Sequence, residues 1–176
     1  MSMSEELKLT PVELFFCGKL LQAKYIDYDY FAAMPDIQIN HDLREQEALE
    51  KLEEDGVVEM DFYDNAEFEE EAKELLLPVF FGETESRMEI KDGPVFRFHI
   101  YQGKMIMTIL EDNEIRLQGI TRDSQLEELW EKSEIEEIVI SCANVHTGQK
   151  NGFFTKEQLM DSGSRKLAIS LLKGEA

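Results

Sequence analysis

The sequence predicts an α+β fold with an antiparallel meander of about four to six strands, flanking helices and a mainly helical N-terminal part. Two observations support this. Apolar residues recur with a helical period up to residue 82, and alternate with polar residues between 87 and 117. Turn sequences such as Asp92-Gly-Pro94 separate the alternating segments. At 176 residues, 43% of them hydrophobic, the chain is expected to form a single domain with a sizeable core.

Three helices are predicted in the N-terminal part. Thr10 and Glu13 have capping-box spacing and Pro11 suits the first turn, so a helix is expected over residues 10–22. A second helix over 42–55 is expected to end at Gly56, followed by a strand over 58–62. The third is expected over 68–79, with Pro78 ending or kinking it. The segment 48–57 also gives this part a winged-helix-like pattern of helix and strand.

The remaining elements complete a meander and a helical C-terminus. Strands are predicted over 87–91, 96–101, 105–110 and from 115, and Ser124-Gln-Leu-Glu127 has the spacing of a capping box. A last strand over 138–142 precedes a polar loop over 143–152 and helices near 155–158 and 165–173. The expected parts of the domain 1–176 are therefore a flexible N-terminus (1–8), a mainly helical part (9–82), the meander with one helix (83–143), and a loop with C-terminal helices (144–176).

Acidity is the strongest compositional feature. The formal net charge is −20, from 18 basic and 38 acidic residues. Such a surface repels nucleic acid and anionic lipid. A DNA-reading helix would also carry Lys and Arg, whereas the helix over 42–55 directs Glu45, Glu47, Glu50, Glu53 and Glu54 outward. The sequence therefore predicts no nucleic-acid partner.

Motifs for chemistry are absent from the sequence. It contains no nucleophile elbow and neither of the common glycine-rich phosphate loops. Cys142-x-x-x-His146 is the only local pair with metal-ligand character, and structural zinc usually needs four ligands. We therefore expect no catalytic residue, no metal and no cofactor, and interpret the protein as a non-enzyme. An enzyme remains a third hypothesis, which requires a pocket with convergent polar groups.

Aromatic and methionine residues are the candidate partner contacts. Tyr and Phe are favoured at protein interfaces because they supply large contact areas at a low entropic cost. The alternative is that they close the ends of the sheet. The predicted contacts are Phe96, Phe98, Met105, Met107, Phe153, Phe154, Tyr28 and Tyr30.

A cytoplasmic location is expected. Residues 1–8 lack the basic and apolar regions of a signal peptide, and no apolar run approaches the roughly 20 residues that span a bilayer. Cys17 and Cys142 are expected to be reduced, buried thiols. No membrane insertion is predicted.

The order of elements resembles a known family. A leading Leu9-Thr-Pro-Val-Glu-Leu-Phe-Phe segment precedes Glu47-Ala-Leu-Glu-Lys-Leu-Glu-Glu-Asp-Gly-Val-Val58, then a second amphipathic helix closing on Leu75-Leu-Leu-Pro78 and a strand meander. Over residues 9–130 this order is similar to that of EspG-type chaperones of type VII (ESX) secretion and their EsaE-like Gram-positive relatives.

The resemblance implies a non-enzymatic chaperone or adaptor that holds a secreted helical substrate through an apolar groove or a sheet edge. The alternative hypothesis is an immunity or antitoxin protein whose acidic surface around residues 67–74 masks a basic toxin or nuclease. The sequence leaves the oligomeric state open.

Overall fold

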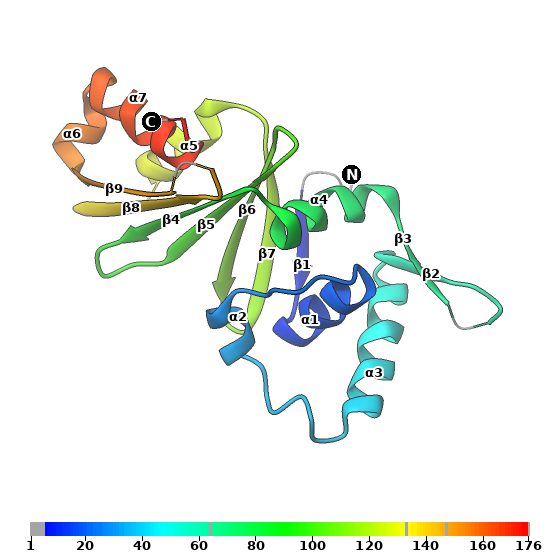
Figure 1. The fold of residues 1–176 in the computed structure, drawn as a ribbon. Coiled ribbons are helices and arrows are strands. Elements are labelled where there is room, and N and C mark those ends of the chain that lie inside the picture. Colours follow the sequence, from blue (N-terminus) through cyan, green and yellow to red (C-terminus); the bar gives the residue numbers. More distant parts are fainter. Residues whose placement is uncertain (1–5, 64, 133, 147, 176) are drawn as a thin grey trace. The chain divides into compact units, whose positions relative to one another are not determined.

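The computed structural model describes residues 6–63, 65–132, 134–146 and 148–175 (Figure 1). The fold is α+β, as predicted. The chain forms two compact units: the first contains the residues up to Phe81 together with Leu110–Leu117, and the second contains Gly82–Ile109 and the residues from Gln118 onward. From the sequence we expected one domain, with a change from helices to strands near residue 82.

The described residues contain seven helices and nine strands. In chain order these are β1 (Glu6–Leu9), α1 (Pro11–Leu20), α2 (Tyr28–Ala32), α3 (His41–Glu54), β2 (Val58–Met60), β3 (Ala66–Phe68), α4 (Glu70–Phe81), β4 (Thr84–Ile90), β5 (Val95–Tyr101), β6 (Lys104–Glu111), β7 (Glu114–Ile120), α5 (Asp123–Lys132), β8 (Glu137–Asn144), β9 (Gly148–Thr155), α6 (Lys156–Met160) and α7 (Ser162–Leu172).

Seven strands form one sheet, in the order β1-β7-β6-β5-β4-β8-β9, and β2 and β3 form a separate antiparallel pair. The expected four to six strands were therefore too few. All pairings from β6 through β5, β4 and β8 to β9 are antiparallel. The second unit thus contains most of the predicted meander, and the hairpin of β8 and β9 continues the sheet beside β4.

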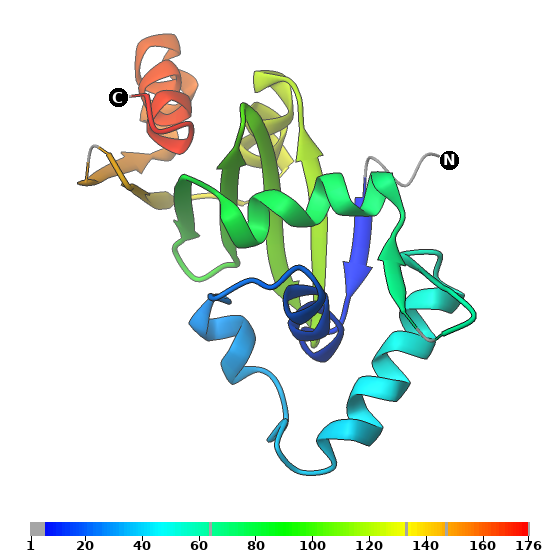
Figure 2. The same ribbon diagram turned by 45° about the vertical axis from the view of Figure 1, so that its right-hand side comes forward.

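The first unit is built around helices with well-defined ends (Figure 2). Thr10 Oγ1 accepts a hydrogen bond from the backbone N–H of Glu13, and Glu13 Oε1 accepts one from that of Thr10, so the predicted capping box of α1 is confirmed. At the end of α3, Gly56 takes the left-handed φ of 73° that favours glycine. The core of this unit includes Leu14, Phe16, Leu52, Leu75 and Leu76.

Two expectations for the first unit need correction. Residues 66–68 form β3 before α4 begins at Glu70, so the third helix starts later than predicted. Pro78 lies inside α4, which continues to Phe81, so this proline does not end the helix. The expected flexible segment 1–8 lies partly outside the described residues, and its described part forms most of β1.

The second unit packs α5, α6 and α7 on one face of its strands (Figure 1). The residues of β4, β5, β6 and β8 that point to this face form a continuous core with these helices, including Met88, Phe98, Ile140, Leu126 and Leu172. Ser86 Oγ donates a hydrogen bond to the Leu172 carbonyl at 2.7 Å, and Trp130 Nε1 lies 3.1 Å from Met88 Sδ. Gly152 allows close packing here, because a Cβ would lie 2.5 Å from Leu171 Cδ1.

Three further sequence expectations concern the second unit. The segment predicted as a polar loop forms β9, which pairs with β8. Helix α5 begins at Asp123, so Ser124 is not its cap; instead Gln125 Oε1 accepts hydrogen bonds from the backbone N–H groups of Thr121 and Arg122 at 2.7 and 3.0 Å. The predicted helix at 155–158 is confirmed, with a complete capping box between Thr155 and Gln158.

Candidate protein-binding surfaces

Most of the predicted partner contacts belong to the core. Five of them form part of the apolar cluster of the second unit, and Tyr30 is fully buried in the first; the five are Phe96, Phe98, Met105, Met107 and Phe154. Their side chains point to the helix-covered face of the meander, so in the folded protein they present no apolar surface to a partner. Only Tyr28, 79% exposed, and Phe153, 54% exposed, lie at the surface.

The first unit carries an acidic groove, which we call the α3 groove. It has a volume of about 570 Å³ and is lined by Asp42, Glu45, Gln46, Leu49, Glu50, Glu53 and Met60. Four of these residues are carboxylates and none is basic. Leu49 and Met60 are half-buried and give the groove its apolar part.

Both the helical period and the hairpin produce this arrangement. Asp42, Glu45, Gln46, Leu49 and Glu53 recur at spacings of three or four, which places them along one face of α3. Glu53 Oε2 accepts a hydrogen bond from the backbone N–H of Met60 at 3.1 Å, which ties β2 to the end of α3. Gln46 Nε2 donates to Glu50 Oε1 at 3.1 Å. Apart from Glu45 Oε2, which accepts a hydrogen bond from Lys19 Nζ, the other carboxylate oxygens offer acceptors around two apolar side chains.

A histidine and two carboxylates meet at the start of α3. Ligand atoms of His41, Asp42 and Glu45 lie within 4.8 Å of one another. However, Glu45 Oε2 also accepts a hydrogen bond from Lys19 Nζ at 2.9 Å. A metal ion at this position would have to displace that ammonium group. The sequence did not identify this group, while the pair that it did single out is split: Cys142 is buried in β8 and His146 is exposed.

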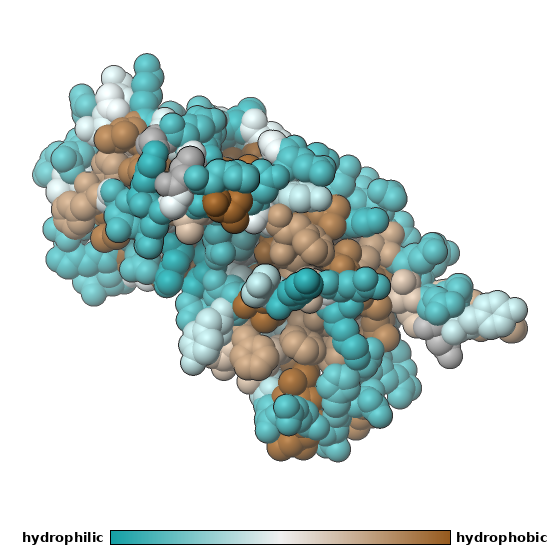
Figure 3. Space-filling view, in the orientation of Figure 1, coloured by the Kyte–Doolittle hydropathy of each residue, from teal (hydrophilic) through white to brown (hydrophobic). Residues whose placement is uncertain are grey.

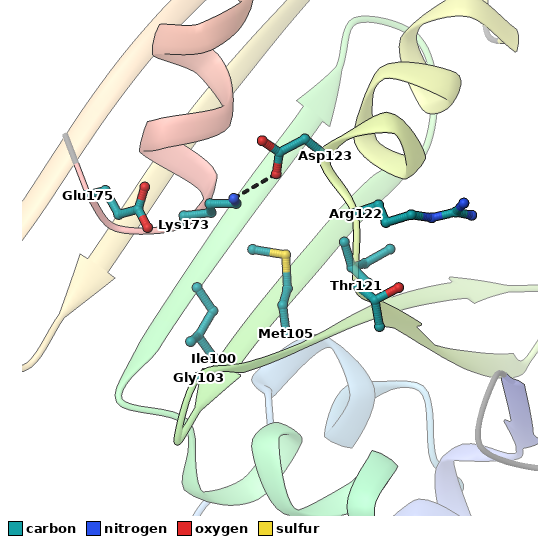
Figure 4. A pocket seen from close by; sticks show the side chains of 9 residues that line it. Ile100, Gly103, Met105, Thr121, Arg122, Asp123, Lys173 and Glu175 are labelled. Atoms are coloured by element: carbon teal, nitrogen blue, oxygen red, sulfur yellow. Dashed lines mark ion pairs between the residues drawn. The ribbon is translucent and has the colours of Figure 1, made fainter.

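A smaller pocket lies in the second unit (Figure 4). It has a volume of about 240 Å³ and is lined by Ile100, Gly103, Met105, Ile120, Thr121, Arg122, Asp123, Lys173 and Glu175. Lys173 Nζ lies 2.6 Å from Asp123 Oδ1, and this hydrogen-bonded ion pair raises the pKa of Lys173. Figure 4 shows Arg122 directed away from the pair. The charges lining the pocket balance, and the ion pair joins the end of α7 to the start of α5.

Cys17 and His99 are buried groups whose surroundings account for them within the fold. Burial, together with the nearby Glu13 carboxylate, strongly raises the pKa of the Cys17 thiol, so it is not a thiolate at neutral pH. His99 Nε2 lies 3.0 Å from Thr108 Oγ1, and both residues are buried on adjacent strands of the sheet. These contacts satisfy polar groups inside the fold.

No protein-family model matches this chain, and no curated protein sequence matches it. The helices of the described residues are all too short or too polar to cross a membrane.

Sequence reasoning recognised only part of these surfaces. The outward Glu45, Glu50 and Glu53 were visible in the helical period of α3 and were used there only to exclude DNA. The contribution of Met60 was not visible, because it depends on how the β2–β3 hairpin packs beside α3.

Proposed function

We propose that this protein is a non-enzymatic protein-binding module, an adaptor or chaperone that holds a cationic, amphipathic helix of its partner in the α3 groove. The observation that carries the proposal is the composition of the groove, with four carboxylates around Leu49 and Met60 and no basic lining residue. A helix with Leu or Met on one stripe and Lys or Arg beside it complements that surface in shape and in charge.

The role resembles that of the EspG-type secretion chaperones, with the protein acting in the cytoplasm on a secreted helical substrate. The charge of α3 supports protein recognition rather than DNA recognition. The helix carries six acids and two bases, Arg44 and Lys51. A surface of this charge repels phosphates and attracts basic side chains.

The proposal is tested by measuring the affinity of two model peptides by calorimetry. The first is a helical peptide with leucines on one stripe and lysines on its flanks, and the second has glutamates in place of the lysines. Binding of the lysine peptide alone is expected. The double variant E50Q/E53Q removes two groove charges, each contributing about 0.2–1 kcal/mol at an exposed site, so affinity should fall about 2- to 30-fold.

A matched control separates the groove from general acidity. Glu70 and Glu71 lie exposed in the first turn of α4, so E70Q/E71Q changes the net charge by the same amount at another place. Binding that is weakened equally by both double variants, or not at all by E50Q/E53Q, refutes the groove as the binding site.

The second candidate function is an immunity or antitoxin protein that masks a basic toxin. The exposed acids Glu67, Glu69, Glu70, Glu71 and Glu74 around the start of α4 favour it. Under this hypothesis E70Q/E71Q weakens binding of a basic protein more than E50Q/E53Q does. Affinity should then fall steeply with salt, because the interaction is dominated by exposed charges. A groove that also buries apolar side chains retains more of its affinity at high salt.

A further inference from the structure

We propose that the outer edge of β9 is a second docking site, which takes an extended strand of a partner protein with alternating acidic and apolar residues. The site lies entirely in the second unit and is independent of the α3 groove. In the described part of the chain β9 pairs with β8 alone, and it is the last strand of the sheet order. A strand in this position can extend the sheet by one partner strand.

Two hydrogen bonds show which residues of β9 direct their backbone N–H and C=O groups toward β8 and which direct them outward. Lys156 N–H donates to the Glu136 carbonyl at 3.0 Å, and the register pairs Thr155 with Glu137. Lys156 and Glu136 are therefore opposite each other and form a hydrogen-bonded pair. Hydrogen-bonded and non-hydrogen-bonded pairs alternate along an antiparallel ladder, so the even-numbered residues of β9 form the hydrogen bonds to β8. Lys91 N–H donates to the Glu137 carbonyl, so the odd-numbered residues of β8 form their backbone hydrogen bonds with β4. The even-numbered residues of β8 are then left to bond β9, in agreement with the first hydrogen bond.

The outward backbone groups of β9 are therefore those of Gln149, Asn151 and Phe153. All three side chains are exposed, so a partner strand can approach this edge. These residues offer three N–H donors and three carbonyl acceptors at alternate positions, which is the pattern that an added strand requires.

The side chains of the edge define the chemistry of the added strand. Phe153 is 54% exposed and lies opposite Val139, 41% exposed, on the face of the sheet away from α6 and α7. An apolar side chain in register with Phe153 would pack on this pair. Lys150 lies opposite Cys142 and thus on the other face, where it favours an acidic residue. Because Lys150 and Phe153 lie on opposite faces of the sheet, the added partner strand should alternate between acidic and apolar residues.

Charge selects this occupant. The segment from Val145 to Lys156 contains two lysines and no acid, in a chain with 38 acids. In the space-filling view, brown apolar groups interrupt the hydrophilic surface over this end of the second unit (Figure 3). An acidic strand is attracted to this edge. A second copy that paired through its own β9 in antiparallel fashion would place the Lys150 side chains of both copies in the same two-stranded pair, where like charges repel.

The test uses the full chain and a fluorescent peptide of about eight residues with alternating Val and Glu, compared with one of alternating Val and Lys. The Val/Glu peptide is expected to bind at the β9 edge, and the Val/Lys peptide is not, because Lys150 repels it there. Two N-methylated Val/Glu peptides, each modified at alternate residues, provide the sharpest readout. Strand addition predicts that one methylation pattern removes binding and that the other retains it, because only alternate N–H groups of the added strand face β9.

Variants of the protein locate the site. In N151P the lost N–H points outward, so the β8–β9 ladder keeps its bonds while peptide affinity falls about tenfold or more. N151A is the matched control and should bind as the unmodified chain does. Fluorescence of Trp130 and protection of Cys142 from alkylation confirm that the second unit stays folded. E50Q/E53Q should leave this binding unchanged. Three results would each overturn the proposal: equal effects of the two methylation patterns, unchanged peptide binding to N151P, or dimerisation of the chain through this edge.

Discussion

Substituting Gly18 by alanine tests the packing of the first unit. Gly18 is buried near the end of α1, and an added Cβ would lie 2.7 Å from Phe80 Cε1 and 3.0 Å from its Cζ. Alanine in a helix interior is favoured over glycine by about 1 kcal/mol. Overfilling a packed core costs about 1–3 kcal/mol. The steric cost exceeds the gain in helix propensity, so G18A should lower the stability of the first unit by about 0–2 kcal/mol.

The variant F80L reveals the two opposed contributions. Leucine lacks the ring atoms that an alanine at position 18 would meet, so in the F80L background G18A should stabilise the unit by up to about 1 kcal/mol. The change of sign between the two backgrounds corresponds to a coupling energy of about 1–3 kcal/mol. A simple change in helix propensity would give the same sign in both.

The two buried cysteines provide an assay for each unit. Cys17 lies in the first unit and Cys142 in the second, and both thiols are free and buried. Pulsed alkylation at increasing urea concentration, with mass spectrometry of the two peptides, therefore yields two unfolding midpoints. G18A should lower the Cys17 midpoint and leave the Cys142 midpoint unchanged. A stabilised first unit in G18A, or no coupling with F80L, would refute the steric argument.

Three smaller predictions concern hydrogen-bonded side chains. The ion pair with Asp123 raises the pKa of Lys173 and so stabilises the folded state at pH values below the ordinary lysine pKa. This stabilisation is lost as the pH rises through the raised pKa. D123N should therefore slightly lower the pH at which the protein unfolds in alkali, as followed by Trp130 fluorescence. Hydrogen bonds from the backbone and side chain of Asn65 lower the pKa of Asp61, so the β2–β3 turn should lose order as the pH falls below the ordinary aspartate pKa and through this lowered value. D61A should show that state at neutral pH in amide NMR spectra. S86A leaves a buried carbonyl of α7 without its 2.7 Å donor, which should cost about 1–3 kcal/mol in the Cys142 alkylation midpoint.

Local signals in the sequence predicted elements well where one or two side chains decide the structure. The Thr10–Glu13 and Thr155–Gln158 capping boxes are confirmed because each closes within four residues. The box expected at Ser124 was wrong, since Gln125 bonds the backbone before the helix and α5 begins two residues earlier than that box implies. When two polar side chains compete for one cap, spacing alone does not choose between them.

Elements that depend on distant partners were not predictable in this way. Strand β9 has exposed residues on both faces over Gly148–Asn151, so it lacks the apolar alternation that marks a half-buried strand. It exists because β8 supplies a complete hydrogen-bonded ladder.

The partner contacts predicted on β5 show why the sequence did not locate the binding surface. Alternation places Phe96 and Phe98 on one face but does not say which face meets solvent. In the structure Arg97 and His99 on the other face are also buried. The acidity of α3 was readable from composition, while the groove required the tertiary position of Met60.

Two carboxylates of the α3 groove, Glu50 and Glu53, oppose the stability of the helix that carries them. Glu53 lies in the last turn of α3 and Glu50 just before it, where the partial negative charge of the helix end disfavours acids; Lys51 is the basic residue of that turn. Relieving this repulsion should raise the stability of the first unit in E50Q/E53Q by about 0.3–1 kcal/mol at low salt, measured by the Cys17 alkylation midpoint. Glutamine at position 53 retains an oxygen that can accept the Met60 N–H bond.

The same variant should therefore bind the lysine peptide more weakly while folding more stably. E70Q/E71Q gives the opposite control, because acids in the first turn of α4 are favoured by the helix dipole and their loss should lower stability. A joint loss of stability and binding in E50Q/E53Q would mean that these carboxylates support the fold. A gain in stability with loss of binding would mean that they are placed for a partner at the expense of the helix.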